Sequence, residues 1–298
     1  MKKFVIAMVV IILIGAVLAG IGCAVFFSSD LRFDSQNVEY TEKLFETEEE
    51  FSIANLNLNA AHKIIFERGE KCSVKYVDSD VTSFAIEVRN NSLVISENRW
   101  DWKNWIKRLF YKLKTTDIVI TVPEGITFDL DGELSGATEM NLPSWEYGKI
   151  DLDIAGAATV NANDISASSI SLTVSGATTI IMSGKADSLR MHASGAVIMK
   201  GKSFNCPQID VRSSGSTELD LSGMGNTLTL HASGSGRIFA KDFALERAEL
   251  DISGSVESEL NVSSFLKVAS SGSARVYYWG DPKVEQSTSG SSKIEKRG

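Results

Sequence analysis

The sequence predicts an all-β protein whose main part is a parallel β-helix, or β-solenoid, of about nine coils, with a transmembrane helix before it. Three observations lead to this prediction. A tripeptide of small residues centred on glycine recurs every 18–20 residues along the second half of the chain. Apolar and polar residues alternate on both sides of each tripeptide. The chain starts with an apolar run, and its 23 glycines against 4 prolines favour strands and turns.

The first element is the apolar run at residues 4–27, which is uncharged and long enough to cross a bilayer, since a spanning helix needs about 20 residues. It is longer than the apolar part of a cleaved signal peptide and has no clear cleavage site, so we expect residues 1–27 to be an uncleaved signal-anchor. Lipidation of Cys23 is the alternative, although no large aliphatic residue lies three positions before it.

The basic residues Lys2 and Lys3 precede this run, so the positive-inside tendency places the N-terminus in the cytoplasm. We therefore expect a single-pass protein of the cytoplasmic membrane with an extracytoplasmic C-terminal domain. Residues 28–50 are polar, end in three glutamates and are expected to be a spacer between the membrane and that domain.

Residues 51–128 contain short runs of β-branched and aromatic residues between turn signals, which predict irregular first coils of the same sheet. The expected strands are residues 53–58, 63–66, 73–77, 83–88, 92–96 and 117–122.

Residues 129–298 contain the regular repeats. Their central glycines are Gly136, Gly156, Gly176, Gly195, Gly215, Gly234, Gly254, Gly272 and Gly290. The sixth residue before each glycine is apolar in all nine copies, and the fourth is apolar in all but the first and last copies, as is expected of capping repeats.

Two short strands joined at a glycine bend can bury their apolar faces only by stacking on the next repeat, which predicts a solenoid. A right-handed coil is the usual hand, and an antiparallel meander is the weaker alternative, because no tripeptide is Asn-Gly or Asp-Gly.

Each glycine is expected to permit either a positive φ or a close approach to the neighbouring coil. A phosphate-binding loop is the functional alternative, but no lysine follows these glycines and no helix is expected after them.

Charge and cysteine content narrow the function classes. Without Lys2 and Lys3 the chain has 28 basic and 38 acidic residues, a net charge of −10, which disfavours nucleic acid as a partner. Cys72 and Cys206 lie far apart in the sequence and suggest neither a zinc site nor a disulfide framework, so we expect two buried thiols and no cofactor.

Four carboxylates occupy equivalent positions on two successive repeats: Asp131, Glu133, Asp151 and Asp153. A solvated acidic stripe is the preferred interpretation, with a calcium site or acid catalysis as alternatives. His192 and His231 also share one position, but Arg212 lies between them, and two coils are about 9.6 Å apart, too far for one zinc ion. His62 has no partner that the sequence reveals. We predict no catalytic residues and no enzyme activity.

Two further surfaces are candidates for contacts. Residues 99–114 are basic, and on a helical period Trp102, Trp105, Ile106, Leu109 and Leu113 share one face. This amphipathic insertion suits either a cap over the open end of the solenoid or a membrane contact, with an unstructured insertion as the third alternative. Ile181, Ile198, Phe239 and Tyr277 are expected to point outward, where they either form an interaction patch or are covered by loops.

The closing stretches Val276-Tyr-Tyr-Trp-Gly-Asp-Pro-Lys-Val284 and Ser287-Thr-Ser-Gly-Ser-Ser-Lys-Ile294, together with the repeats, resemble the bacterial putative auto-transporter adhesin family with the head GIN domain, and related membrane-anchored putative adhesins of unknown function. The resemblance covers residues 51–298 and implies a β-helical exported domain.

We accordingly expect a cell-surface adhesion or envelope scaffold protein, with an envelope protein or a cell-wall glycan as partner. An envelope-stress sensor is the alternative, and a polysaccharide-active enzyme is less favoured.

Overall fold

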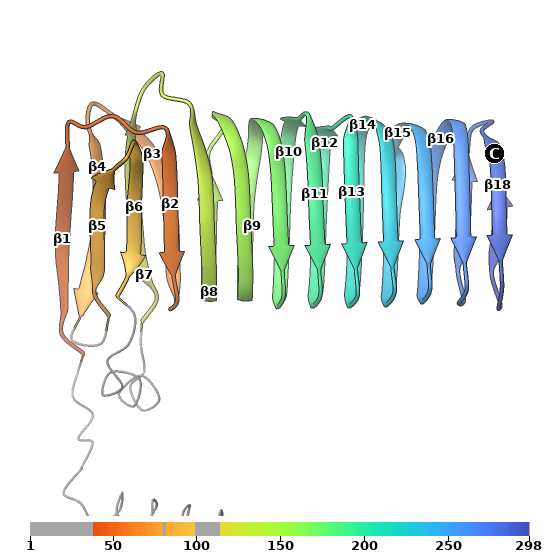
Figure 1. Cartoon of the computed structure of the whole chain (residues 1–298), viewed down its shortest axis with the longest axis horizontal. Helices are drawn as coiled ribbons and strands as arrows, with labels where there is room; N and C mark the ends of the chain where they lie inside the picture. The colour runs from red at the N-terminus through yellow and green to blue at the C-terminus, as the bar shows by residue number, and fades with distance from the viewer. Residues whose placement is uncertain (1–37, 80–81, 99–113, 298) are drawn as a thin grey trace, which may run out of the picture.

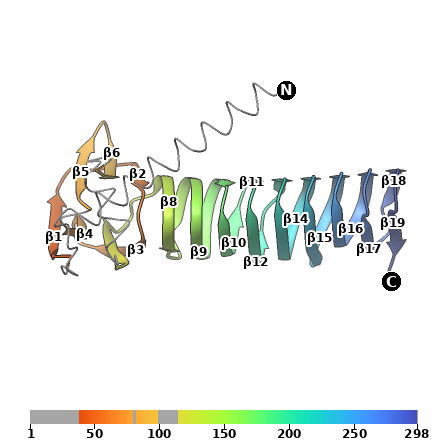
Figure 2. The same ribbon diagram turned by 90° about the horizontal axis from the view of Figure 1, so that it is seen from below.

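The computed structural model describes residues 38–79, 82–98 and 114–297. All regular elements in these ranges are strands, and they lie side by side along one axis from β1 at one end to β18 and β19 at the other (Figures 1 and 2). The predicted membrane span and the amphipathic insertion lie outside the described residues. No described segment forms a helix with the length and apolar character that a membrane crossing needs.

The N-terminal strands are β1 (Tyr40–Thr47), β2 (Ile53–Leu58), β3 (His62–Gly69), β4 (Cys72–Ser79), β5 (Phe84–Arg89), β6 (Ser92–Glu97) and β7 (Thr116–Pro123). The solenoid strands are β8 (Phe128–Leu142), β9 (Glu146–Val174), β10 (Ala177–Ala186), β11 (Ser188–Ala193), β12 (Ala196–Asn205), β13 (Gln208–Ser213), β14 (Ser216–Ala232), β15 (Ser235–Ile252), β16 (Ser255–Ser270), β17 (Arg275–Trp279), β18 (Lys283–Thr288) and β19 (Lys293–Lys296).

The solenoid strands pair in parallel, and equivalent repeat positions lie beside one another. Leu172 pairs with Met191, Met191 with Val211, and Val211 with Leu230. The parallel pairing confirms the solenoid and excludes the meander. The glycines stack directly, from Gly136 to Gly290. Nine stacked glycines bound eight intervals, so the regular part makes about eight turns, one fewer than the nine coils predicted.

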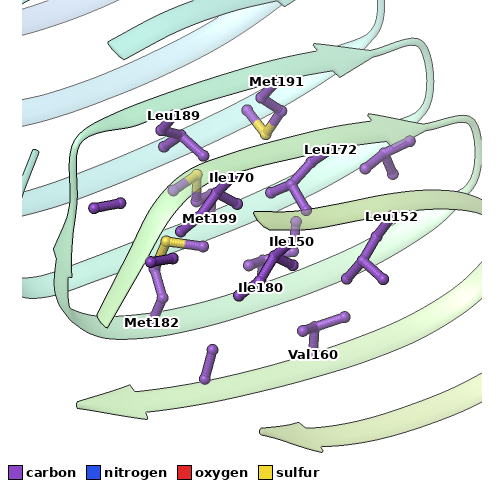
Figure 3. Close-up of a cluster of buried hydrophobic side chains, with 14 of the residues drawn as sticks. Ile150, Leu152, Val160, Ile170, Leu172, Ile180, Met182, Leu189, Met191 and Met199 are labelled. Carbon is purple, nitrogen blue, oxygen red and sulfur yellow. The ribbon is translucent and has the colours of Figure 1, made fainter. Parts of the chain in front are cut away.

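The core is a continuous column of apolar side chains between the two strands of each coil. Figure 3 shows Ile150, Leu152, Ile170 and Leu172 from strands before the glycine pointing toward Val160, Ile180 and Met199 from strands after it. All of these side chains are buried. Burying a side chain of this size contributes about 1.5–3 kcal/mol, and each coil supplies several. Stacking of incomplete units therefore holds the fold together, as the periodicity predicts.

The N-terminal strands join this solenoid out of sequence order. Strands β2 and β3 form a coil that pairs in parallel with β8 on one side and with β6 and β7 on the other. Strand β4 then runs antiparallel to β7 and β1, and β5 antiparallel to β6. The six predicted strands are all present. The antiparallel pairing that ends the parallel stack was not predicted, because the residue pattern of one strand does not show which strand it will pair with.

One strand in this region is not among those predicted. Residues 40–47 of the expected spacer form β1, which pairs along its whole length with β4. Most of its side chains are exposed, and the Lys43 ammonium lies 2.5 Å from the Asp78 carboxylate of β4. A strand at a sheet edge needs no apolar face on its outer side, so its sequence resembles a polar linker.

Candidate functional site

The nine stacked glycines, which we call the glycine ladder, run along one edge of the solenoid. The residues on either side of them are alanine or serine, and their small side chains leave a shallow groove on each side of the ladder. The first groove, of about 500 Å³, lies beside the strands that precede the glycine, and the second, of about 660 Å³, beside the strands that follow it. Both run parallel to the solenoid axis because equivalent positions stack.

The first groove is lined by a column of outward side chains at the third position before each glycine. In order along the axis these are Thr173, His192, Arg212, His231 and Asp251. The His231 Nδ1 atom lies 3.6 Å from the Asp251 carboxylate, and the Arg212 Nε atom lies 3.6 Å from Asp210. The two histidines are thus separated by Arg212, in agreement with the predicted spacing. Small side chains line the groove beside this column, and the exposed ones among them, which we call the serine floor, are Ser194, Ser214, Ser233 and Ser253.

The second groove is lined by a column at the third position after each glycine. Ile198, Glu218, Arg237, Glu257 and Arg275 follow one another there. Opposite charges alternate, and the Arg237 guanidinium lies 3.9 Å from Glu218. This column therefore neutralises itself and offers less unpaired charge to a ligand than the first groove does.

The structure brings the four predicted carboxylates together in one place. Asp131 pairs with Asp151 and Glu133 with Asp153, while the amides of Asn55 and Asn57 donate to Asp131 and Glu133 at 3.4 and 3.2 Å. Partial burial and the neighbouring carboxylates, Asp151 first, raise the pKa of Asp131. Within the described ranges no set of three His, Cys, Asp or Glu side chains has the geometry of a metal site.

The four predicted patch residues do not form one continuous patch. Ile198 is exposed, whereas Ile181, Phe239 and Tyr277 are half-buried. Charged residues stand between them on the intervening coils, since Phe239 pairs with Asp220 on one side and with Glu259 on the other, and Tyr277 with Glu259. Arg297 also lies over the Tyr277 ring at 4.5 Å.

His62 has partners that the sequence does not reveal. Its Nε2 atom lies 3.2 Å from the Glu97 carboxylate and its Nδ1 atom 2.8 Å from the Thr116 hydroxyl, and the His62 and Glu97 side chains are both 1% exposed. The Glu97 carboxylate also accepts from the Asn59 N–H at 2.7 Å. The pairing of β3 with β7 places Thr116 beside His62, and the pairing of β2 with β6 places Glu97 near it.

Cys72 and Cys206 are buried and free, and burial raises the pKa of each thiol to about 11. Both thiols therefore stay protonated at neutral pH and are poor nucleophiles.

Residues 99–113, with Trp102, Trp105, Ile106, Leu109 and Leu113, lie outside the described residues, so neither the cap nor the membrane contact is tested. The flanking residues are described. Glu97 ends β6, and Lys114 precedes β7; both strands belong to the outermost parallel coil. The Lys114 N–H donates to the Tyr40 hydroxyl at 3.0 Å, and the Lys114 ammonium lies 5.9 Å from the Tyr40 ring.

Solved structures share this fold. A putative adhesin from Parabacteroides merdae aligns with a TM-score of 0.54 at 12% identity over 87% of this chain and 97% of its own. A putative adhesin from Parabacteroides distasonis aligns with a TM-score of 0.51 at 15% identity, with the same coverage. A putative lipid binding protein from that organism aligns with a TM-score of 0.50 at 20% identity over 88% of this chain and 98% of its own. These likenesses concern the fold alone, and the search of curated proteins finds no match.

The sequence profile of one family covers most of the described residues. It matches residues 54–206 and 198–282, which include the first coils and all but the last glycine of the ladder. The chain therefore belongs to the family described as putative auto-transporter adhesin, head GIN domain.

Proposed function

We propose that this chain is a membrane-anchored, extracytoplasmic interaction protein that mediates adhesion or scaffolding at the cell envelope, without enzyme activity. The observation that carries the proposal is the form of the solenoid, a straight stack of coils (Figure 1). Two long grooves lie beside its glycine ladder. Such a stack presents outward side chains at a regular spacing along its length, which suits contact with an extended partner.

The contact between Tyr40 and Lys114 supports a defined orientation on the membrane. Tyr40 begins β1, 13 residues after the end of the predicted span at residue 27, so the chain between them reaches at most about 45 Å. Lys114, the last residue of the basic amphipathic insertion, donates a hydrogen bond to Tyr40. The C-terminal end of the insertion therefore lies beside the N-terminal end of β1. Under this proposal the β1 end faces the membrane, and the β18 end points away from it.

Proteolysis of cells that produce the full chain tests the topology. Protease added to intact, wall-stripped cells is expected to remove the domain from residue 28 onward, whereas a cytoplasmic marker survives. Survival of the whole chain until the cells are lysed would refute the extracytoplasmic location.

An attachment assay tests the adhesive role. Cells that produce the chain are expected to bind envelope preparations or neighbouring cells more strongly than cells that produce a variant without residues 129–297. Equal attachment by the two strains, at equal surface amounts of both proteins, would contradict the proposal.

A further inference from the structure

The chemistry of the first groove identifies a class of ligand. We propose that the column His192, Arg212 and His231, with the serine floor beside it, binds a linear glycan that carries acid groups and lies parallel to the solenoid axis. This inference rests on the proposed role in envelope contacts and specifies its partner.

The first argument is periodicity. The groove presents one outward side chain of this column at every coil, about 4.8 Å apart, because the strands pair in register from Ser171 to Glu249. A ligand that uses equivalent contacts on successive coils must itself repeat at a similar distance. The rise of one sugar in an extended glycan is close to this spacing, whereas an extended peptide presents a side chain to the same face only every second residue.

The second argument is the state of the Arg212 side chain. It is 57% exposed, and its separation of 3.6 Å from Asp210 is too long for a hydrogen bond. Among the described residues it has no hydrogen-bond partner, so its planar fork is free to bind a carboxylate in a bidentate manner. In the second groove, Arg237 lies between Glu218 and Glu257 on the adjacent coils. In the first groove, Arg212 has a histidine on each adjacent coil of its column, and its nearest carboxylate belongs to Asp210 on its own strand.

The third argument is what surrounds Arg212. His192 and His231 stand on the adjacent coils in the same column, so three nitrogen donors follow one another along the axis. The serine hydroxyls of the floor can bond sugar hydroxyls. No Trp, Tyr or Phe is among the described residues that line this groove, so recognition depends on hydrogen bonds and charge instead of ring stacking. Beyond His231 the column continues with Asp251, whose carboxylate repels an acid group. The acid group of the ligand is therefore expected to lie at Arg212.

Titration of the purified full chain in mild detergent tests the proposal. The probes are an oligomer of galacturonic acid and a neutral chitin oligomer of equal length, and binding is measured by calorimetry. We expect the acidic oligomer to bind more tightly than the neutral one and to lose affinity as salt is raised. Arg212→Gln should weaken binding of the acidic oligomer at least tenfold, because a charge-assisted hydrogen bond contributes about 1.5–3 kcal/mol.

Arg237→Gln in the second groove is the matched control, and it should leave binding unchanged. Failure of the full chain to bind the acidic oligomer, equal binding of the neutral one, or equal losses in the two variants would overturn the assignment. Both arginines are exposed, so both variants are expected to keep the melting temperature of the unmodified chain. Adhesion that persists in Arg212→Gln cells would reject the glycan site while leaving the adhesive role intact, and oligomer binding without adhesion would reject only that role.

Discussion

At the scale of single residues, the stacked glycines are needed for close approach more than for unusual backbone angles. Only the first and last glycines of the ladder, Gly136 and Gly290, have a positive φ, of 122° and 91°. At the seven positions between them, an added Cβ would overlap the backbone of the glycine on the preceding coil. Two roles were expected for these glycines, a positive φ or a close approach to the neighbouring coil. The close approach is therefore the main one.

A Gly195→Ala substitution tests this contact. Its Cβ would overlap the Gly176 carbonyl, so we expect a loss of about 3 kcal/mol in the free energy of unfolding. Gly195→Val and Gly215→Val should cost at least as much. Gly236→Ala is the control, because its Cβ would lie 3.3 Å from the nearest atom, the Thr217 carbonyl oxygen, and its φ is ordinary. Urea denaturation measures the difference, and similar stabilities of the two alanine variants would refute the close-contact explanation.

A buried threonine offers a stabilising substitution. The Thr178 side chain is 2% exposed, and its hydroxyl is among the buried polar atoms without a hydrogen-bond partner. Val197 occupies the same position on the next coil. Thr178→Val should therefore raise the free energy of unfolding by about 1 kcal/mol, since the unpaired hydroxyl costs about that much when buried.

Thr217 provides the contrast, because its hydroxyl shares a hydrogen bond with Ser213. Thr217→Val should lower stability. A destabilised Thr178→Val variant would indicate that its hydroxyl has a partner after all.

The cluster of Asp131, Glu133, Asp151 and Asp153 predicts that stability depends on pH. Burial and the neighbouring carboxylates raise the pKa of Asp131 in the folded chain above its unfolded value. The folded state thus binds this proton more tightly, and the destabilisation from Asp131 is fully present above the folded pKa and lost as pH falls below the unfolded value.

Asp131→Asn should accordingly raise the melting temperature at pH 7, and the gain should vanish in acid. Asp220→Asn, which faces Lys200 on the preceding coil, should bring no such gain. A gain from Asp131→Asn that persists unchanged at low pH would contradict repulsion as its cause.

At the scale of elements, an experiment can distinguish the two roles expected for the amphipathic insertion at residues 99–114, a cap or a membrane contact. Replacement of Trp102, Trp105 and Leu109 by serine should leave the melting temperature nearly unchanged if the segment contacts the membrane. Binding of the purified protein to anionic vesicles should then fall, and fall further with salt. A lower melting temperature in the absence of lipid would support a cap instead, and no change in either assay would contradict both readings.

At the scale of the whole molecule, the stack behaves as a one-dimensional array, in which each coil contacts mainly its neighbours. Removing residues 176–194 deletes one full turn and joins Ser175 to Gly195, which keeps the ladder in register. We expect this variant to keep a β-sheet circular dichroism spectrum and a cooperative unfolding transition. Deleting residues 176–185 removes half a turn, brings unlike strands together and should abolish the transition. Loss of folding in both variants would contradict the array description.

The sequence by itself determined the solenoid strands, the repeat and the column that each residue of a repeat would join. Alternation of apolar and polar residues around Gly176 or Gly215 is local information, and stacking is the only way such short strands can bury their apolar faces. The tertiary structure alone decided the antiparallel end, the pairing of His62 with Glu97, and the grooves with Arg212 exposed in one of them. These features depend on contacts between distant segments, and neither the periodicity nor the charge of one segment specifies which distant segment will lie beside it.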